Sequence, residues 1–105
     1  MKTLKFMLYD EPMEVFFVID SYTTNDNLAI MAYNKDGEFY GDVTTCIPFG
    51  YVEENEFYAS NNSEFLIKAM IKEKLIKDLD DSISSGYAIF HKMKITKKFM
   101  EYVKE

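Results

Sequence analysis

Side chains that commonly act as nucleophiles, bases or metal ligands are scarce in this sequence. It has one histidine, His91, one cysteine, Cys46, and no arginine or tryptophan. If Cys46 and His91 faced each other across a sheet, the thiol could act as a nucleophile and the imidazole as its base. A nucleophilic thiol also needs a cationic neighbour that lowers its pKa, and only the lysines after residue 90 could supply one. We therefore expect Cys46 to be a half-buried structural residue and His91 to be packed and hydrogen-bonded.

Five polar residues could still line a pocket between the sheet and the helix that are predicted below. They are Asp42, Cys46, Asn61, Asn62 and His91. Such a pocket would serve an enzyme or a binder of a small ligand. No recognisable catalytic motif accompanies these residues, so we expect no enzymatic activity, and the small-ligand alternative stays open.

Two acidic runs, residues 53–56 and 78–81, carry carboxylates that could hold a hard cation such as calcium. Neither run has the ligand spacing or the central glycine of an EF-hand loop. Binding of zinc would need a cluster of histidine and cysteine, which the composition excludes. We expect solvated carboxylates with no metal and no cofactor, although a carboxylate pair for glycoside-type chemistry stays open.

The segment 49–58 is the strongest candidate for binding a partner. It interleaves four aromatic residues with three glutamates, and the candidate partner-binding residues are Phe49, Tyr51, Glu53, Glu54, Glu56, Phe57 and Tyr58. Aromatic side chains on a polar loop are common at protein interfaces. The alternative is that these rings fold back onto the sheet and belong to the core.

The charge of the chain favours a basic partner. The net charge is −6 and is unevenly distributed. Residues 1–62 have a net charge of −8, from three lysines and eleven acidic residues, and residues 63–105 have a net charge of +2. An acidic surface repels phosphate backbones. Without arginine, the bidentate contacts that read base edges are also missing. We therefore expect a protein partner with a basic surface and no direct binding of nucleic acid.

The composition indicates one folded domain over residues 1–105. Nearly half of the residues are hydrophobic and 16% are aromatic, which is more than disordered chains contain. The N-terminal residues lack the apolar segment of a secretory signal, and no stretch approaches the ~20 apolar residues of a membrane span. A single cysteine forms no intrachain disulfide. We expect a cytoplasmic protein with no membrane partner.

Apolar residues alternate with polar ones through most of the first half of the chain, which predicts strands. The predicted strands cover residues 3–8, 13–22, 28–33 and 38–47. Turn-forming residues separate them at 10–12, 25–27 and 34–37, and the last of these, Asn-Lys-Asp-Gly, is the clearest hairpin turn. Pro48 ends the fourth strand, because proline donates no hydrogen bond to a sheet. A connecting loop is expected over residues 49–62.

The second half predicts a helix, a strand and a short terminal helix. The main helix should begin after Asn62 or Ser63, either of which can cap it, and run to about Leu75. A fifth strand over 87–95 and a short helix after Thr96 follow. The expected fold class is α+β: a four- to five-stranded, mostly antiparallel sheet with one main helix packed on it and a short C-terminal helix.

Apolar residues form two stripes on the predicted main helix. Leu66, Ile67, Met70 and Ile71 make the broad stripe, which should face the sheet, and Phe65, Ala69 and Ile76 lie nearly opposite. The second stripe needs cover from the terminal Phe99 and Val103 or from a second copy of the chain. A homo-oligomer, and with it a self-associating structural protein, is therefore an open alternative.

Short motifs in the middle and end of the chain resemble a bacterial family. They are Tyr40-Gly41-Asp42-Val43-Thr44-Thr45-Cys46-Ile47-Pro48, then Asn61-Asn62, then Ser85-Gly86-Tyr87. Over roughly residues 28–95 their order and spacing are similar to the uncharacterised domain-of-unknown-function family 4313. There a strand ends in Thr-Val-Asn-Leu-Pro, Asp-x-Asn-Asn precedes a helix, and Ser-Gly-aromatic opens the last strand. Here Cys46 stands where asparagine is usual, and Ala59 where aspartate is usual.

The resemblance implies a small bacterial protein of a kind often encoded on mobile elements, and it implies no activity. Combined with the acidic charge and the aromatic segment 49–58, it favours a small cytoplasmic, non-enzymatic binding module. On a mobile element, such a module would modulate or inhibit a host system by protein–protein contact. The alternatives are a small-ligand binder or enzyme with its pocket near Asp42, Cys46 and His91, and a self-associating structural protein.

Overall fold

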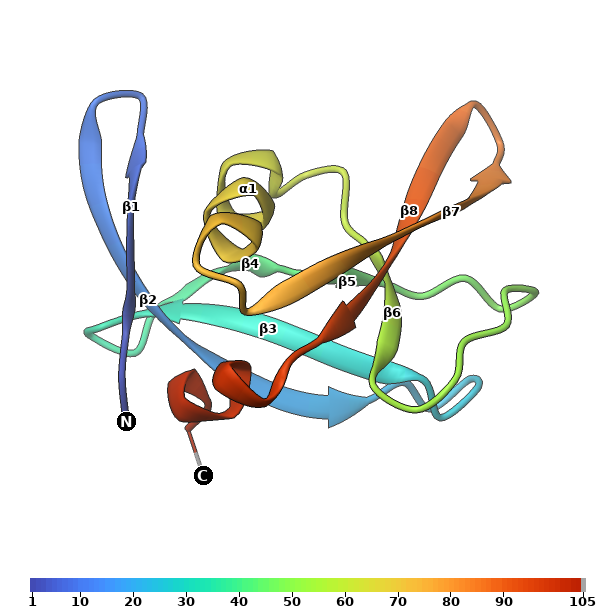
Figure 1. Ribbon diagram of the computed structural model, residues 1–105, viewed down its shortest axis with the longest axis horizontal. Coiled ribbons are helices and arrows are strands. Elements are labelled where there is room, and N and C mark those ends of the chain that lie inside the picture. Colours follow the sequence, from blue (N-terminus) through green and yellow to red (C-terminus); the bar gives the residue numbers. More distant parts are fainter. Residues whose placement is uncertain (105) are drawn as a thin grey trace.

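The computed structural model of the protein describes residues 1–104. It is an α+β fold of two four-stranded antiparallel sheets, one α-helix and a short C-terminal 3-10 helix (Figure 1). The predicted fold class, the main helix and the short C-terminal helix are confirmed. The strands form two sheets where a single sheet of four to five strands was expected.

The first sheet consists of consecutive hairpins in the order β1-β2-β3-β4. Its strands are β1 (Leu4–Leu8), β2 (Glu11–Ser21), β3 (Leu28–Asn34) and β4 (Phe39–Asp42). The predicted turns at 25–27 and 34–37 are confirmed, and Gly37 adopts the positive φ of 88° that the second of these turns requires. The first turn is shorter than predicted, because Tyr9 and Asp10 alone reverse the chain with positive φ, and Pro12 pairs with Met7 inside the hairpin.

The second sheet has the order β5-β6-β8-β7. Its strands are β5 (Thr44–Thr45), β6 (Glu56–Ala59), β7 (Ile76–Ser85) and β8 (Ala88–Ile95). The predicted strand 38–47 is therefore divided at Val43 between the two sheets. Val43 is fully buried, donates its N–H to Ile30 and accepts a hydrogen bond from the N–H of Ser60. This residue joins the two sheets.

Strand β8 is predicted correctly, but the sequence does not predict its two neighbours. Strand β6 lies inside the expected loop 49–62 and has only four residues. Strand β7 contains three aspartates, and Ile76 is its one buried residue. Neither segment has the alternation that identifies a strand locally. Both strands depend on pairing with β8.

The main helix α1 (Glu64–Lys72) is shorter than predicted, because Lys74 takes a positive φ of 60° just after its end. Leu66, Ile67 and Met70 of the broad stripe are buried, as expected, but its fourth member, Ile71, is exposed. On the opposite stripe, Phe65 is covered in part by Tyr9, whose ring centroid lies 5.1 Å from that of Phe65. The expected cover from Phe99 is not provided, since Phe99 packs against Phe17.

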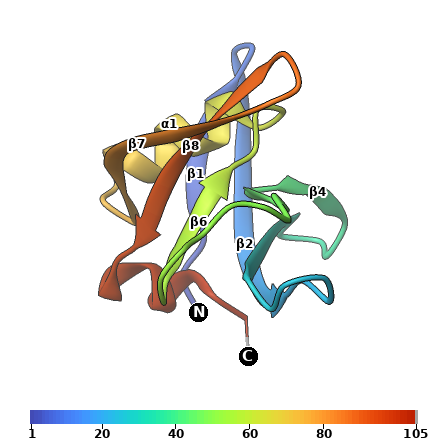
Figure 2. The same cartoon turned by 90° about the vertical axis from the view of Figure 1, so that its right-hand side faces the viewer.

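The C-terminal helix η1 (Lys97–Tyr102) and the N-terminus lie at the same end of the molecule (Figures 1 and 2). Thr96 does not cap η1 as predicted, because its hydroxyl donates to the carbonyls of Lys74 and Leu75. One continuous core fills the space between the sheets and α1, and its largest fully buried members include Val15, Phe17, Ile30, Val43, Phe57, Leu66, Met70, Leu75 and Phe99. Within residues 1–104, no helix is long and apolar enough to cross a membrane.

Candidate functional site

The segment that leads into the candidate partner-binding residues is a tight turn. The N–H of Gly50 donates to the carbonyl of Ile47 over 3.0 Å, with Pro48 and Phe49 at the corner. The ring of Tyr58 packs directly on the Gly50 backbone, because a Cβ atom there would lie 2.5 Å from Tyr58 Cε2. This packing holds the turn against the sheet and leaves Phe49 exposed.

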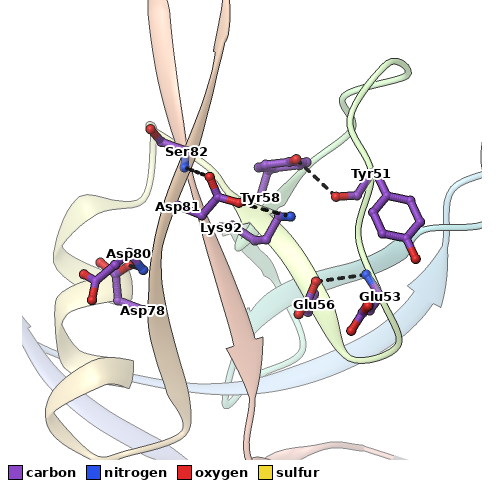
Figure 3. Close-up of polar contacts among 9 residues, drawn as sticks. All are labelled: Tyr51, Glu53, Glu56, Tyr58, Asp78, Asp80, Asp81, Ser82 and Lys92. Carbon is purple, nitrogen blue, oxygen red and sulfur yellow. Dashed lines mark hydrogen bonds and ion pairs between the residues drawn. The ribbon is translucent and has the colours of Figure 1, made fainter.

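The four aromatic candidates divide into two pairs. Phe57 and Tyr58 of β6 are buried, so they belong to the folded body, which is the alternative that the sequence analysis left open for these rings. Phe49 and Tyr51 lie in the preceding loop and are exposed, with 72% of Tyr51 accessible. The Tyr58 hydroxyl donates to the Tyr51 carbonyl over 3.3 Å, which anchors the loop at this residue (Figure 3).

The outer side of Tyr58 is covered by a lysine from β8. Lys92 Nζ lies 5.7 Å from the centroid of the Tyr58 ring and 3.4 Å from Asp81 Oδ2 on β7 (Figure 3). Only 15% of the Lys92 side chain is exposed. Burial acts to lower the pKa of Lys92, but Tyr58, Asp81 and Glu56 act against it, and the pKa is raised above its ordinary value. The ammonium therefore stays charged and neutralises Asp81.

The three glutamates of the loop have different roles. Glu56 closes the turn on itself, because its carboxylate accepts the N–H of Glu53 over 2.9 Å and its own N–H donates to the Glu53 carbonyl over 3.0 Å (Figure 3). Asn55 takes the left-handed conformation, with φ at 69°, and its carbonyl accepts the N–H of Ile95. Glu53 and Glu54 are exposed on this ordered turn and carry the charge available to a partner.

A second acidic segment lies beside this turn. The chain between β2 and β3 and the turn at 52–56 line a common hollow of about 310 Å³. Five carboxylates line this hollow, and among the described residues no lysine lines it. We call these five acidic residues the acidic surface; they are Asp20, Asp26, Glu53, Glu54 and Glu56. The hydroxyls of Tyr22 and Thr44, 2.7 Å apart, attach the segment between β2 and β3 to β5. Asp20 and Asp26 are not predicted as site residues from the sequence, because only tertiary contacts bring them here.

The predicted polar pocket is assembled in part. Asp42, Asn61 and Asn62 line one hollow of about 560 Å³ between β4 and the start of α1. His91 lines a neighbouring hollow that shares Asn61 with the first. Cys46 is half-buried, as predicted, and lines neither hollow. The structure therefore gathers four of the five residues around the start of α1 and leaves Cys46 apart from His91.

His91 differs from expectation in its burial. It was expected to be packed and hydrogen-bonded, but it is exposed. The reason is that the β7–β8 hairpin extends past the core, so the part of β8 that carries His91 is open to solvent (Figure 1). Among the described residues, no group of three or more histidine, cysteine, aspartate or glutamate side chains is placed to hold a metal ion.

Comparisons with protein-family models, with curated proteins and with solved structures give no match for this chain. The resemblance to family 4313 stays a prediction.

Proposed function

We propose that the protein is a small binding module that contacts a basic protein through the acidic surface and the exposed rings of Phe49 and Tyr51. The partner would place lysine or arginine side chains against the carboxylates and apolar groups against the two rings. Interfaces commonly combine aromatic anchors with a charged rim in this way.

One observation carries this proposal. Carboxylates from two separate segments, 20–28 and 52–56, meet at one hollow, and no lysine among the described residues lines it. Like charges held together repel each other, so a surface of this kind attracts cations and steers a basic partner toward it. The turn that carries Glu53 and Glu54 is already ordered by Glu56, so little conformational entropy would be lost on binding.

The sharper form of the proposal follows from the chemistry of basic partners. Proteins that bind nucleic acid present clusters of lysine and arginine to the phosphate backbone. An acidic module that covers such a cluster would inhibit the host protein by competition. Support for this form comes from the net charge of −6 and from the resemblance to a family often encoded on mobile elements.

Site-specific photo-cross-linking tests where the partner binds. A photoreactive phenylalanine analogue is placed at Tyr51, and at Met100 of η1 as the matched control, since both side chains are largely exposed. Irradiation of the source cells should give an adduct with a basic protein from position 51 and none from position 100. The same adduct from both positions, or adducts from position 100 alone, would place the partner elsewhere.

A further inference from the structure

A second hollow on the protein lies away from the acidic surface. It has a volume of about 560 Å³ and is formed by the tip of the β1–β2 hairpin, strand β4 and the segment that leads into α1. Its volume is within the range of sites for small ligands. The acidic surface is lined by none of the same residues, so the two regions are separate.

Three solvent-exposed aromatic rings line this hollow. Tyr9, Phe39 and Phe65 all line it and are 80%, 57% and 40% exposed. Tyr9 packs edge-on against Phe65, and Phe39 packs edge-on against Tyr33. In an edge-to-face pair, one ring covers a face of the other and keeps both of its own faces uncovered by that partner. A ring face is electron-rich and attracts a cation that lies over it.

Two of the polar residues that line the hollow carry negative charge. Asp42 and Glu64 contribute carboxylates, Asn61 and Asn62 contribute amides, and no lysine lines the hollow among the described residues. Glu64 is paired with Lys68 over 2.9 Å, so Asp42 is the carboxylate without an ion pair among the described contacts. The start of α1 would by itself favour an anion, but these two carboxylates oppose an incoming negative charge.

Hydrogen bonds hold one wall of the hollow in place. Ser63 immediately precedes α1 but makes no cap with its side chain; its hydroxyl donates to the carbonyl of Asp42 over 2.7 Å. The N–H of Ser60 donates to Val43, and the N–H of Asn62 donates to the Ser60 hydroxyl. Two of these bonds attach the segment 60–63 to Asp42 and Val43, and the third lies within the segment, so the backbone that carries the two asparagines is held beside Asp42.

We infer that this hollow binds the guanidinium group of an arginine side chain from another molecule. A guanidinium stacks on aromatic faces and donates paired hydrogen bonds to a carboxylate, and both kinds of group line the same hollow here. The amide oxygens of Asn61 and Asn62 can accept its remaining N–H groups. The chain contains no arginine, so no group of its own can occupy the hollow in this way.

A titration followed by two-dimensional NMR tests the site. The probe is Nα-acetyl-L-arginine amide, and the matched control is the citrulline analogue, which has the same shape without the charge. Arginine amide should shift the signals of Gly41, Asn61 and Asn62 with a dissociation constant on the order of 1–10 mM. Asp42→Asn should weaken this binding roughly fivefold to tenfold. Phe39→Ala should weaken it as well, and Asp80→Asn on β7, which lines neither hollow, should leave it unchanged.

Each other result overturns the inference. Equal shifts with the citrulline analogue would show that the charge is not recognised, and binding of a neutral sugar such as methyl glucoside in its place would assign a different ligand class. Shifts confined to Glu53 and Glu54 would show only general attraction to the acidic surface. The absence of shifts at Gly41, Asn61 and Asn62 at concentrations on the order of 10 mM would remove the site. None of these results depends on whether the acidic surface binds a protein.

Discussion

The carboxylate of Asp81 meets the ammonium of Lys92 at 3.4 Å because β7 carries two extra residues. Asp78 lies opposite Met93, but the next residue of β8, Lys92, lies opposite Asp81. Leu79 and Asp80 form the bulge between them, and Asp80 has a positive φ of 56°. The bulge therefore brings a carboxylate to the lysine that covers Tyr58. It also interrupts the regular hydrogen-bonding edge of β7.

Lys92 should stabilise the sheet more through its aliphatic stem than through its charge. Its side chain is mostly buried against Tyr58, whereas Asp81 is exposed, and exposed ion pairs contribute little. Lys92→Ala should cost about 1–2 kcal/mol of unfolding free energy, and Lys92→Met clearly less. Urea denaturation of both variants measures this. A methionine variant as unstable as the alanine variant would show that the charge is the larger contribution.

Ser63 should stabilise the fold as a donor to β4 and not as a helix cap. Its hydroxyl donates to the Asp42 carbonyl and the residue is buried. Ser63→Ala should cost about 1 kcal/mol. Ser63→Asp should be worse than alanine, because a carboxylate cannot donate this bond and would face a carbonyl oxygen. An aspartate variant as stable as the wild type in thermal denaturation would indicate ordinary capping.

Replacing Gly50 should disturb the aromatic loop. A methyl group at this position would lie 2.5 Å from Tyr58 Cε2 and 3.2 Å from Ile47 Cγ2, so the ring or the turn must move. Gly50→Ala should cost about 1–3 kcal/mol, as overpacking typically does. Gly41→Ala is the control, since its nearest contact would be Ser63 Oγ at 3.4 Å. Equal losses of unfolding free energy for the two variants would contradict the close packing of Tyr58 on Gly50.

Acid should weaken one link between the N-terminus and β2. Thr3 donates to Glu14 over 2.6 Å, and this bond lowers the pKa of the Glu14 carboxyl below its ordinary 4.5. A lowered folded-state pKa gives stability that is present above the ordinary pKa and is lost as the pH falls through the folded-state value. Thr3→Val should therefore be less stable than the wild type at pH 7, and the difference should shrink as the pH falls below the ordinary pKa of 4.5. A difference in unfolding free energy that stays the same from pH 7 into this acid range would exclude this mechanism.

The sequence is most informative where structure depends on neighbouring residues. The hairpin at Asn34–Gly37 and the strands beside it are predicted because alternation and turn residues are local signals. Strand β7 escapes prediction because its aspartates suit solvent and its pairing partner follows later in the chain. The same holds for the surface. Glu53 and Glu54 are recognisable from the loop, but Asp20 and Asp26 join them only through tertiary packing.

Capture of the partner by matched charge variants tests the central proposal most directly. The wild type, a Glu53→Lys/Glu54→Lys variant and a Glu11→Lys/Asp36→Lys control are used as tagged bait in lysate of the source organism. Both variants change the net charge equally, and all four residues are exposed. Glu56 is left unchanged because its carboxylate holds the turn.

The proposal predicts one stoichiometric basic protein on the wild type and on the control, and its loss from the Glu53→Lys/Glu54→Lys variant. Added salt should weaken this capture. Mass spectrometry identifies the protein, and light scattering reports the stoichiometry. Equal capture by all three baits, or a homo-oligomer with no partner on the wild type, would contradict the acidic surface as the binding site.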